Sequence, residues 1–428
     1  MSTRRRFLLS AATFTAALPL LAQNKEGKQG QGKTQEEPST LPPSIAALKD
    51  RSHEATPIAL PEREARADKA RALMSNRGIA ALCITGGTSL AYFTGIHTGQ
   101  SERLFAWILP ATGNPYIVCP VFEEARMTEQ LGQIPEGRQT KIFTWNEDQD
   151  PYRLLTQQLP AGRLALDERV QFVFADRIQQ ADPSRKIVSA IPIVSACRSI
   201  KSPAELALMQ LANDITLSAY QAAWATGGPG MTNHQFSGLI AQAYERCGVR
   251  GEASCQVGEW SALPHGSPRA QVIREGQIIL IDDGCSVEGY QSDVSRTFVY
   301  GKPTSKQRQV FEIVHQAQAV ALAAARPGVP CEAIDAAARK VVTDAGFGPD
   351  YKTFTHRVGH GIGMDGHEWP YLVRGNTQPL EAAMTFSDEP GIYIPGEFGI
   401  RLEDDWHLTD DGGVLFTPQS PSLEHPFD

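Results

Sequence analysis

The sequence predicts an α/β (α+β) protein of two domains, preceded by an N-terminal export segment. Strand-like and helix-like runs alternate through the first half of the chain, an order typical of an α/β unit. In the second half, a pair of long helical segments precedes a strand-rich segment twice. Roughly 370 residues follow the export segment and its linker, which is more than one average domain holds. We therefore expect two domains.

Residues 1–22 have the layout of a signal peptide. Three arginines at positions 4 to 6 precede a moderately apolar run over residues 7–22, which is too short and too rich in Ser and Thr to remain as a membrane span. The pair Arg4 and Arg5, followed by Phe7 and Leu8, resembles the twin-arginine export motif, with an ordinary secretory signal as the alternative. Both alternatives predict a periplasmic or extracellular protein without a permanent membrane span.

Residues 23–58 are expected to form a disordered tether. From Asn24 to Pro43 the sequence consists mainly of Gln, Lys, Glu, Gly and Pro, with almost no apolar residue to offset the entropy of ordering.

Charge and cysteine content exclude several classes of function. The formal net charge of −8 offers no basic footprint, so no nucleic-acid partner is expected. The seven cysteines include no C-x-x-C pair, which argues against a disulfide framework and against a cysteine zinc site. We expect most of them to be small core residues.

The first domain, expected over residues 59–197, begins with a charged helix near Pro61 to Arg77 and a buried strand from Ile79 to Thr85. Two apolar runs, 105–109 and 116–119, are joined by a turn-rich segment and predict a hairpin. Alternating runs then continue through 141–145, 164–166 and 187–194. Because no group of acids, histidines or nucleophiles occurs here, we expect a structural or substrate-gating role.

The second domain, expected over residues 198–428, begins with a long helix at 203–224, where Pro203 and Glu205 suit the first turn. Further helices are predicted at 233–247, 306–325 and 331–345.

The segment His356 to Glu368 reads HRVGHGIGMDGHE and holds three histidines and four glycines. Each glycine costs a helix about 1 kcal/mol, so the segment is predicted to be a turn or strand that lies close to another group. Gly361, Gly363 and Gly366 match G-x-G-x-x-G, but no strand precedes them and Pro370 ends any following helix. A dinucleotide site is therefore rejected.

Two pairs of acids suggest a metal centre beside this segment. Asp282 and Asp293 are centred between Val287 and Glu288, and hairpins folded at such centres set the two acids opposite each other, with Cβ atoms about 5 Å apart. Glu389 and Glu403 are centred on Gly396 in the same way.

For either pair alone, a solvated acidic hairpin is the alternative. Four carboxylates buried beside His360 would repel one another unless cations neutralised them. Oxygen-rich ligation with one imidazole suits manganese, with cobalt, iron or zinc as alternatives.

These residues resemble those of the pita-bread metallopeptidases, the group of aminopeptidase P, prolidase, methionine aminopeptidase and the non-metal enzyme creatinase. Five ligand positions match in order: Asp282, Asp293, His360, Glu389 and Glu403. Asp-x-Gly at 282–284, Glu-Pro-Gly at 389–391 and Arg401 match as well, and His265, His356 and His367 fall on positions where the family places substrate-site histidines. The departures are Ala383, where the family tends to have glycine, Asp388 before Glu389, and Asp283 as an alternative first ligand.

The resemblance implies a creatinase/prolidase-like N-terminal α/β domain, a pita-bread catalytic domain and a homodimer or higher homo-oligomer. It also implies two divalent metal ions, with Mn²⁺ favoured over Co²⁺, Fe²⁺ or Zn²⁺. Asp282 would bind one ion and His360 the other, Asp293 and Glu403 would bridge them, and Glu389 would accept a proton. The three histidines would hold the substrate and the developing oxyanion, and Arg401 would support Glu403.

The expected activity, implied by the same resemblance, is a metal-dependent Xaa-Pro aminopeptidase acting on peptides with proline at the second position. An Xaa-Pro dipeptidase is the alternative; it must bind a free carboxylate with Arg or His, for which Arg374 and Arg401 are candidates. A non-peptidase enzyme of the same fold is a further alternative. A binding module would be expected to have broken ligands, and none is broken. Trp369 and Tyr371 are candidates for contact with the proline ring, with core packing as the alternative.

Overall fold

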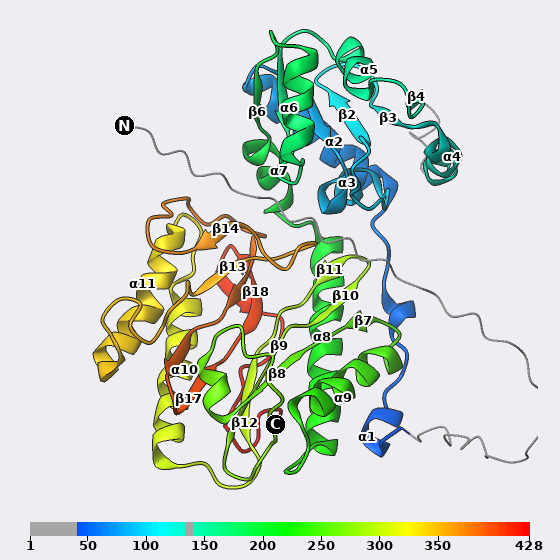
Figure 1. Cartoon of the computed structure of the whole chain (residues 1–428). Helices are drawn as coiled ribbons and strands as arrows, with labels where there is room; N and C mark the ends of the chain where they lie inside the picture. The colour runs from blue at the N-terminus through cyan, green and yellow to red at the C-terminus, as the bar shows by residue number, and fades with distance from the viewer. Residues whose placement is uncertain (1–40, 133–139) are drawn as a thin grey trace, which may run out of the picture. The chain divides into compact units, whose positions relative to one another are not determined.

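The computed structural model describes residues 41–132 and 140–428 (Figure 1). The predicted signal peptide and the first part of the predicted tether lie outside these residues. Residues 41–58 are folded: they form α1 (Pro43–Ala46) and the 3₁₀ turn η1 (Ser52–Glu54), and Ile45 and Ile58 are buried in the core beneath α8 and α9. The tether prediction is wrong for this part, because the polar composition of the segment hid its few apolar anchors.

The N-terminal domain is a six-stranded sheet with helices on both faces. Its elements are α2 (Leu60–Asn76), β1 (Ile79–Ile84), α3 (Gly87–Thr94), β2 (Ala106–Pro110), β3 (Tyr116–Pro120), η2 (Val121–Glu123), α4 (Glu124–Gly132), β4 (Lys141–Trp145), α5 (Pro151–Gln158), β5 (Arg163–Leu166), α6 (Phe172–Ala181), β6 (Ile187–Ser189) and α7 (Ile191–Arg198).

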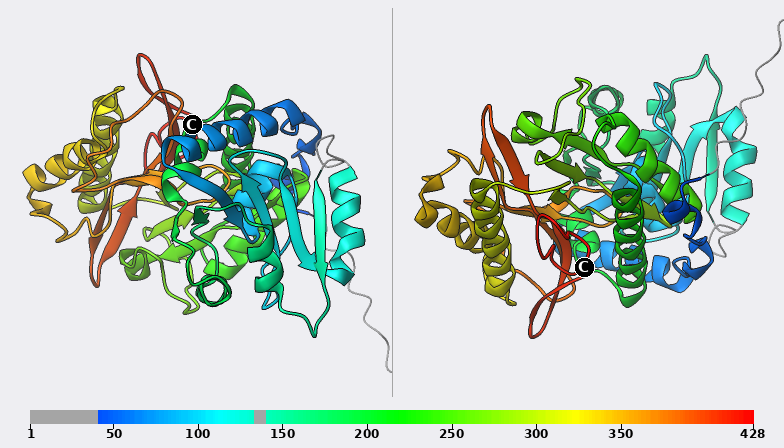
Figure 2. Two further views of the ribbon diagram at one scale, coloured as in Figure 1. Left: turned by 90° about the horizontal axis from the view of Figure 1, so that it is seen from above. Right: turned by 90° about the horizontal axis from the view of Figure 1, so that it is seen from below.

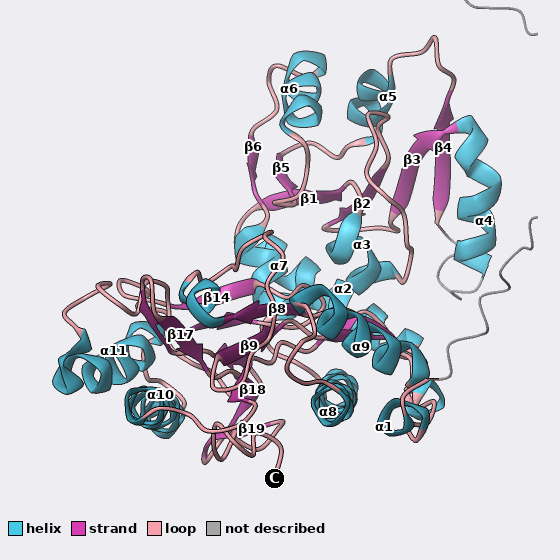
Figure 3. Ribbon diagram, turned by 60° about the horizontal axis from the view of Figure 1, so that its bottom comes forward, coloured by secondary structure: helices cyan, strands magenta, loops and turns pink. Residues whose placement is uncertain are grey.

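The strand order is β4-β3-β2-β1-β5-β6, and β2 and β3 pair antiparallel, so the predicted hairpin is confirmed. One face of the sheet packs against α2, α3, α4 and α7, and the other packs against α5 and α6 (Figure 3). This domain therefore buries two separate apolar layers.

Two helix pairs frame the C-terminal domain. They are α8 (Pro203–Thr226) with α9 (Asn233–Arg246), and α10 (Ser305–Ala324) with α11 (Cys331–Val342), which ends in a π turn at Thr343–Phe347. Capping boxes begin α8, α9 and α10, where Ser202, Thr232 and Thr304 each accept from the backbone three residues on. None of the helices in the described ranges is long and apolar enough to cross a membrane.

The strands of this domain lie between the two helix pairs (Figures 1 and 2). They are β7 (Arg250–Gly251), β8 (Ser254–Val257), β9 (Ile278–Asp282), β10 (Cys285–Val287), β11 (Tyr290–Gln291), β12 (Arg296–Val299), β13 (Gly359–Gly361), β14 (Glu368–Leu372), β15 (Thr385–Asp388), β16 (Gly391–Ile394), β17 (Phe398–Arg401), β18 (Asp404–Thr409) and β19 (Gly412–Leu415), with a 3₁₀ turn η4 (Gly258–Ala262) after β8. One core joins α8 and α9 to β8 and β9, and a second joins α10 and α11 to the sheet β14-β13-β15-β18-β19.

The two predicted hairpins differ in outcome. The second is confirmed, because Gly391 pairs with Arg401 and Ile394 with Phe398, a register centred on Gly396. In the first, Val287 pairs with Tyr290 and Ile281 with Arg296, so the turn lies at Glu288 and Gly289 and the position opposite Asp282 is Ser295. The predicted register is therefore wrong by two residues. A shift of two keeps the same face, so both acids still point to one side.

The seven cysteines are buried and unpaired, as expected of core residues.

Candidate metal centre

The structure brings all five predicted ligands together at the ends of strands. Asp282 ends β9, Asp293 lies between β11 and β12, His360 lies in β13, Glu389 follows β15, and Glu403 joins β17 to β18. Their ligand atoms, together with a ring nitrogen of His367, form three overlapping groups, each within 4.8 Å: Asp282, Asp293 and Glu403; His360, Glu389 and Glu403; and Asp293, His360 and His367. Oxygen atoms with imidazole nitrogens are a donor set that suits divalent transition ions.

His360 is held with one ring nitrogen facing the carboxylates. Its Nδ1 lies 3.2 Å from the carbonyl oxygen of Gly361, which can only accept, so Nδ1 carries the proton. Its Nε2 lies 3.3 Å from Oε1 of Glu389 and 3.8 Å from Oδ2 of Asp293. Burial and the neighbouring His367 keep the pKa of His360 well below its usual value. The ring is therefore neutral, and its free lone pair faces oxygen atoms that are also acceptors, which suits a cation between them.

Glycine is required beside this histidine. A Cβ at Gly359 would lie 2.1 Å from the carbonyl oxygen of Ser387, so β13 can approach β15 only with no side chain there. This close approach sets His360 beside Glu389.

The carboxylates of the cluster oppose one another's ionisation. Burial and the nearby acids raise the pKa values of Asp293 and Glu403 well above their usual range, and burial with the Asp282 charge raises that of Glu389 to about 7. Asp282 differs: burial raises its pKa, but the Arg401 guanidinium and the hydrogen bond from Ser295 act together against burial, and the pKa is lowered. The buried carboxylates need positive charge to be stable in their ionised form, and divalent ions would supply it.

Arg401 and Ser295 hold two of the acids in place. Arg401 forms an ion pair with Asp282, and its Nε lies 3.7 Å from Oε2 of Glu403 and donates to Ser295 Oγ over 2.8 Å. The Ser295 hydroxyl lies 2.6 Å from Asp282 Oδ1 and 2.7 Å from Glu403 Oε2. The sequence prediction missed Ser295, although the true register of the first hairpin would have set it opposite Asp282.

Asp283 is turned away from the cluster. Its backbone has a φ of 105°, and its Oδ2 accepts from the Ser254 amide over 3.0 Å. This geometry favours Asp282 as the member of the pair that faces the centre.

The three predicted substrate-site histidines occupy different surroundings. Nδ1 of His356 lies 2.8 Å from the carbonyl oxygen of Arg357 and its Nε2 lies 2.7 Å from the Tyr393 hydroxyl, so both ring nitrogens have partners. Burial and Arg401 lower the pKa of His356 to about 3. The exposed His367 ring lies 3.8 Å from the His360 ring, centroid to centroid, and His265 is also exposed. Tyr393, which the sequence did not indicate, also accepts from Arg401.

A cation missed by the sequence prediction lies beside these residues. The Arg357 guanidinium lies 4.0 Å from the centroid of the Tyr371 ring, and its Nη2 lies 3.2 Å from Nδ1 of His367. Within residues 41–132 and 140–428, Arg357 forms no ion pair with a carboxylate. The predicted candidates Arg374 and Arg401 are both paired, Arg374 with the exposed Asp350.

Trp369 remains 39% exposed, and its ring centroid lies 4.3 Å from that of Tyr371. Exposure favours contact with a bound molecule over core packing for Trp369.

A further row of acids lies behind the centre. Asp405 accepts from the Asp293 amide over 2.8 Å and from Asn213 over 3.1 Å, and Asp404 pairs with the buried Arg296. Asp388, the departure noted in the sequence, is 1% exposed, and neither of its carboxylate oxygens has a hydrogen-bond partner among the described residues. Of these acids, Asp405 holds the backbone of the candidate ligand Asp293.

The chain matches two family models. Residues 66–200 match the creatinase/prolidase N-terminal domain, and residues 207–410 match metallopeptidase family M24. An Xaa-Pro dipeptidase of Lactobacillus helveticus is 33% identical over 365 residues, which cover 82% of this chain and 95% of the relative.

Solved structures agree with this assignment. The dipeptidase PepE of Mycobacterium ulcerans has a TM-score of 0.81 at 32% identity, over 86% of this chain and 99% of the other. An X-Pro aminopeptidase of Thermotoga maritima has a TM-score of 0.71 at 27% identity, over 84% and 99%. The chain therefore belongs to metallopeptidase family M24, with a creatinase N-terminal α/β domain followed by a pita-bread catalytic domain.

Proposed function

We propose that this metallopeptidase is an Xaa-Pro dipeptidase that works with two divalent metal ions, with Mn²⁺ favoured. The sequence favoured an Xaa-Pro aminopeptidase and gave the dipeptidase as the alternative. The names of the Lactobacillus and Mycobacterium relatives support the dipeptidase, and the Thermotoga structure keeps the aminopeptidase as the second candidate.

In the proposed centre, Asp282, Asp293, His360, Glu389 and Glu403 would hold the two ions. Bound divalent ions supply positive charge that polarises the scissile carbonyl and activates water for attack. The protein's own groups then handle the protons and the substrate.

Glu389 is proposed to accept the proton of the attacking water, because its carboxylate lies at the centre and 3.7 Å from the His356 ring. The exposed His367 is proposed to donate to the developing oxyanion, and His265 to contact substrate at the edge of the site. Since both ring nitrogens of His356 have partners, we assign it to orienting Glu389 and Tyr393.

Arg357 is the residue that supports a dipeptidase over an aminopeptidase. A dipeptidase must recognise the free carboxylate that follows proline, and charge-assisted hydrogen bonds to a guanidinium do this well. Arg357 lies against His367, stacks on Tyr371 and has no carboxylate partner among the described residues. The scissile nitrogen of an Xaa-Pro bond has no N–H, so ring shape must be recognised, and Trp369 is the exposed aromatic candidate.

The test compares the dipeptide Ala-Pro with its amide, which lacks the terminal charge. Arg357→Ala is expected to lower kcat/KM for Ala-Pro by about 10- to 100-fold more than for the amide, since a hydrogen bond to a charged group contributes about 1.5–3 kcal/mol. Effects that pass through His367 cancel in this ratio. Arg374→Ala is the matched control, because Arg374 is already paired with Asp350. Equal losses on both substrates would remove Arg357 as the carboxylate-binding residue.

A further inference from the structure

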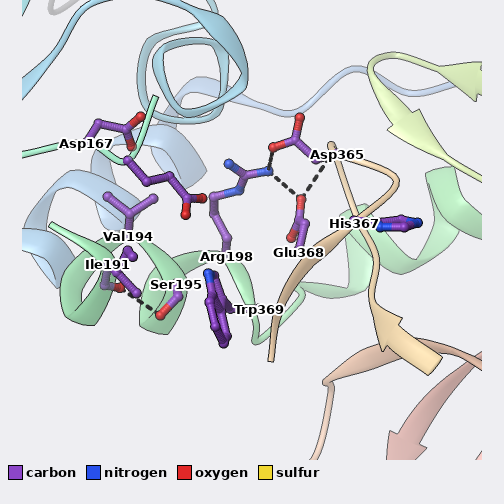
Figure 4. Close-up of a pocket in the computed structure, with 10 residues that line it drawn as sticks. Asp167, Ile191, Val194, Ser195, Arg198, Asp365, His367, Glu368 and Trp369 are labelled. Carbon is purple, nitrogen blue, oxygen red and sulfur yellow. Dashed lines mark hydrogen bonds and ion pairs between the residues drawn. The ribbon is translucent and has the colours of Figure 1, made fainter. Parts of the chain in front are cut away.

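A cluster of charged residues lies beside the segment that carries His367, and Figure 4 draws its members Arg198, Asp365 and Glu368. It consists of Arg198, the last residue of α7, with Lys201, Asp365 and Glu368; Arg198, Lys201 and Glu368 are 4–7% exposed. Glu368 points toward Arg198 in Figure 4, and the His367 ring points away from them. The two acids of the cluster thus flank His367 in sequence, while its ring lies on the opposite side of the segment.

The four residues are connected by direct contacts. Nη2 of Arg198 lies 2.8 Å from Oδ2 of Asp365 and also pairs with Oε1 of Glu368. Lys201 Nζ lies 3.4 Å from the other oxygen of Glu368, and the Asp365 amide donates to Glu368 over 2.9 Å. The cluster therefore ties together the backbone on both sides of His367.

Other segments of the N-terminal domain hold the same acid. The Thr88 hydroxyl at the start of α3 donates to Oδ1 of Asp365 over 2.6 Å, and Arg169 Nη2 lies 3.2 Å from that oxygen. Arg198 itself donates to Ser89 over 3.2 Å. Three separate parts of the domain thus converge on the segment that carries His367.

His367 has little support of its own. Its side chain is exposed, its contacts are with the His360 ring and with Arg357, and Gly366 precedes it. The position of the ring therefore depends on how the neighbouring backbone is held.

We infer that Arg198 is a positioning residue for the reaction, which fixes the His367 ring over the centre through its ion pairs with Asp365 and Glu368. The inference rests on the proposed function, because it assigns His367 a part in turnover. It gives the N-terminal domain an indirect part in catalysis, through the position of His367. The alternative is an ion-pair cluster that stabilises the fold and has no specific link to His367.

A double-mutant cycle separates the two. Arg198→Met, His367→Ala and the double variant are compared for turnover of Ala-Pro with Mn²⁺ present. Arg198→Met is expected to lower kcat by about 10-fold or more, since small misplacements of catalytic groups cost up to about 10²-fold. Metal content should stay at the wild-type level. In the His367→Ala background, Arg198→Met should change kcat by less than about 2-fold, because coupled residues are not additive.

The matched control is Arg66→Met. Arg66 is also a buried arginine, paired with Glu62 and Glu205, and among the described residues it has no hydrogen bond or ion pair with residues 365–368. Its substitution should leave kcat unchanged in both backgrounds. Lys201 still neutralises Glu368 in Arg198→Met, and Asp365→Asn serves as a milder second variant if the first does not fold.

An NMR measurement on metal-free protein supplies a readout independent of activity. The imidazole resonances of His367 should shift in Arg198→Met and stay unchanged in Arg66→Met. Unshifted resonances, or losses of kcat that multiply in the cycle, would overturn the inference. A metal-loaded wild-type protein that does not cleave Ala-Pro would instead overturn the proposed function.

Discussion

Among single residues, Asp293 gives the clearest test of the proposed ligand set. It belongs to two of the three groups of ligand atoms, and its pKa is raised by burial and then by Asp282. Asp293→Asn removes the charge but keeps the size, so we expect loss of bound metal together with activity, and the same for Glu403→Gln. His367→Ala should keep its metal and lose turnover by about 10²-fold. Elemental analysis of the purified variants decides, and a full complement of metal in Asp293→Asn would show that the proposed ligand set is wrong.

Glu368 predicts a pH dependence of stability. Burial raises its pKa, but the charges of Arg198 and Lys201 and the hydrogen bond from the Asp365 amide together lower it from 4.5 to about 2. A lowered folded-state pKa gives stability that is present above pH 4.5 and lost as the pH falls toward 2. Since each pKa unit is worth about 1.4 kcal/mol, the ionised Glu368 contributes about 3 kcal/mol to the free energy of unfolding at neutral pH.

Urea unfolding of metal-free wild type and Glu368→Gln at several pH values measures this contribution. The difference in free energy of unfolding should be constant above about pH 5 and shrink between pH 4.5 and 2. Glu397→Gln, which removes an exposed ion pair with Lys306, is the control and should cost less than about 1 kcal/mol. A wild-type advantage that persists unchanged to pH 2.5 would contradict the assignment.

Residue contacts were the least predictable part of the site. Family spacing identified Asp282, Asp293, His360, Glu389 and Glu403, and the structure brings all of them together. The contact of Arg357 with His367 depends on how β13 pairs with β14, across a bulge between His360 and Gly361 that no sequence pattern shows. Side-chain partners of this kind are set by tertiary packing and not by spacing.

At the scale of elements, capping explains where the helices of the catalytic domain begin. The Thr304 hydroxyl accepts from the Gln307 amide over 3.2 Å, and the Gln307 side chain accepts from the Thr304 amide over 2.7 Å. Thr304→Ala should therefore lower the free energy of unfolding by about 1 kcal/mol and leave kcat/KM unchanged. Ser305→Ala, one residue on, is the control. Chemical denaturation checks both, and equal stability of the two variants would remove the cap as a stabilising contact.

The elements themselves were largely predictable, because their signals are local. The start of α8 at Pro203 follows from its capping residues, and the hairpin centred on Gly396 follows from its turn residues. The predicted register of the first hairpin is wrong by two residues because its turn places Glu288 at a φ of 50°. Positive φ is uncommon for a residue other than glycine, so the sequence does not indicate a turn at this position. Ala383 likewise adopts a φ of 66° where the family tends to have glycine, so the positive φ is kept here although glycine is absent.

At the scale of the whole molecule, the N-terminal domain brings no predicted ligand yet holds the segment that carries His367. Thr88, Arg169 and Arg198 all contact Asp365. Such contacts join residues up to 277 positions apart. Composition and periodicity carry no information at that range, so they predict no sharper role for this domain than a structural or substrate-gating one.

Export stays a prediction, because residues 1–22 lie outside those that the structure describes. Replacing Arg4 and Arg5 with lysine should keep the protein in the cytoplasm if the signal is of the twin-arginine type. Cell fractionation followed by immunoblotting measures this, with the unchanged chain as the control. Undiminished export of the lysine variant would favour the ordinary secretory signal.

The most direct test of the proposed function is a comparison of kcat/KM for Ala-Pro, Ala-Pro-Ala and Ala-Ala with Mn²⁺ present. A dipeptidase that recognises the free carboxylate after proline should cleave Ala-Pro at least about 10-fold better than Ala-Pro-Ala, since one charge-assisted hydrogen bond accounts for that ratio. Recognition of the proline ring should also make Ala-Pro a better substrate than Ala-Ala, which has the carboxylate but no ring. A preference for Ala-Pro-Ala would restore the aminopeptidase assignment. Equal cleavage of Ala-Ala would contradict proline specificity.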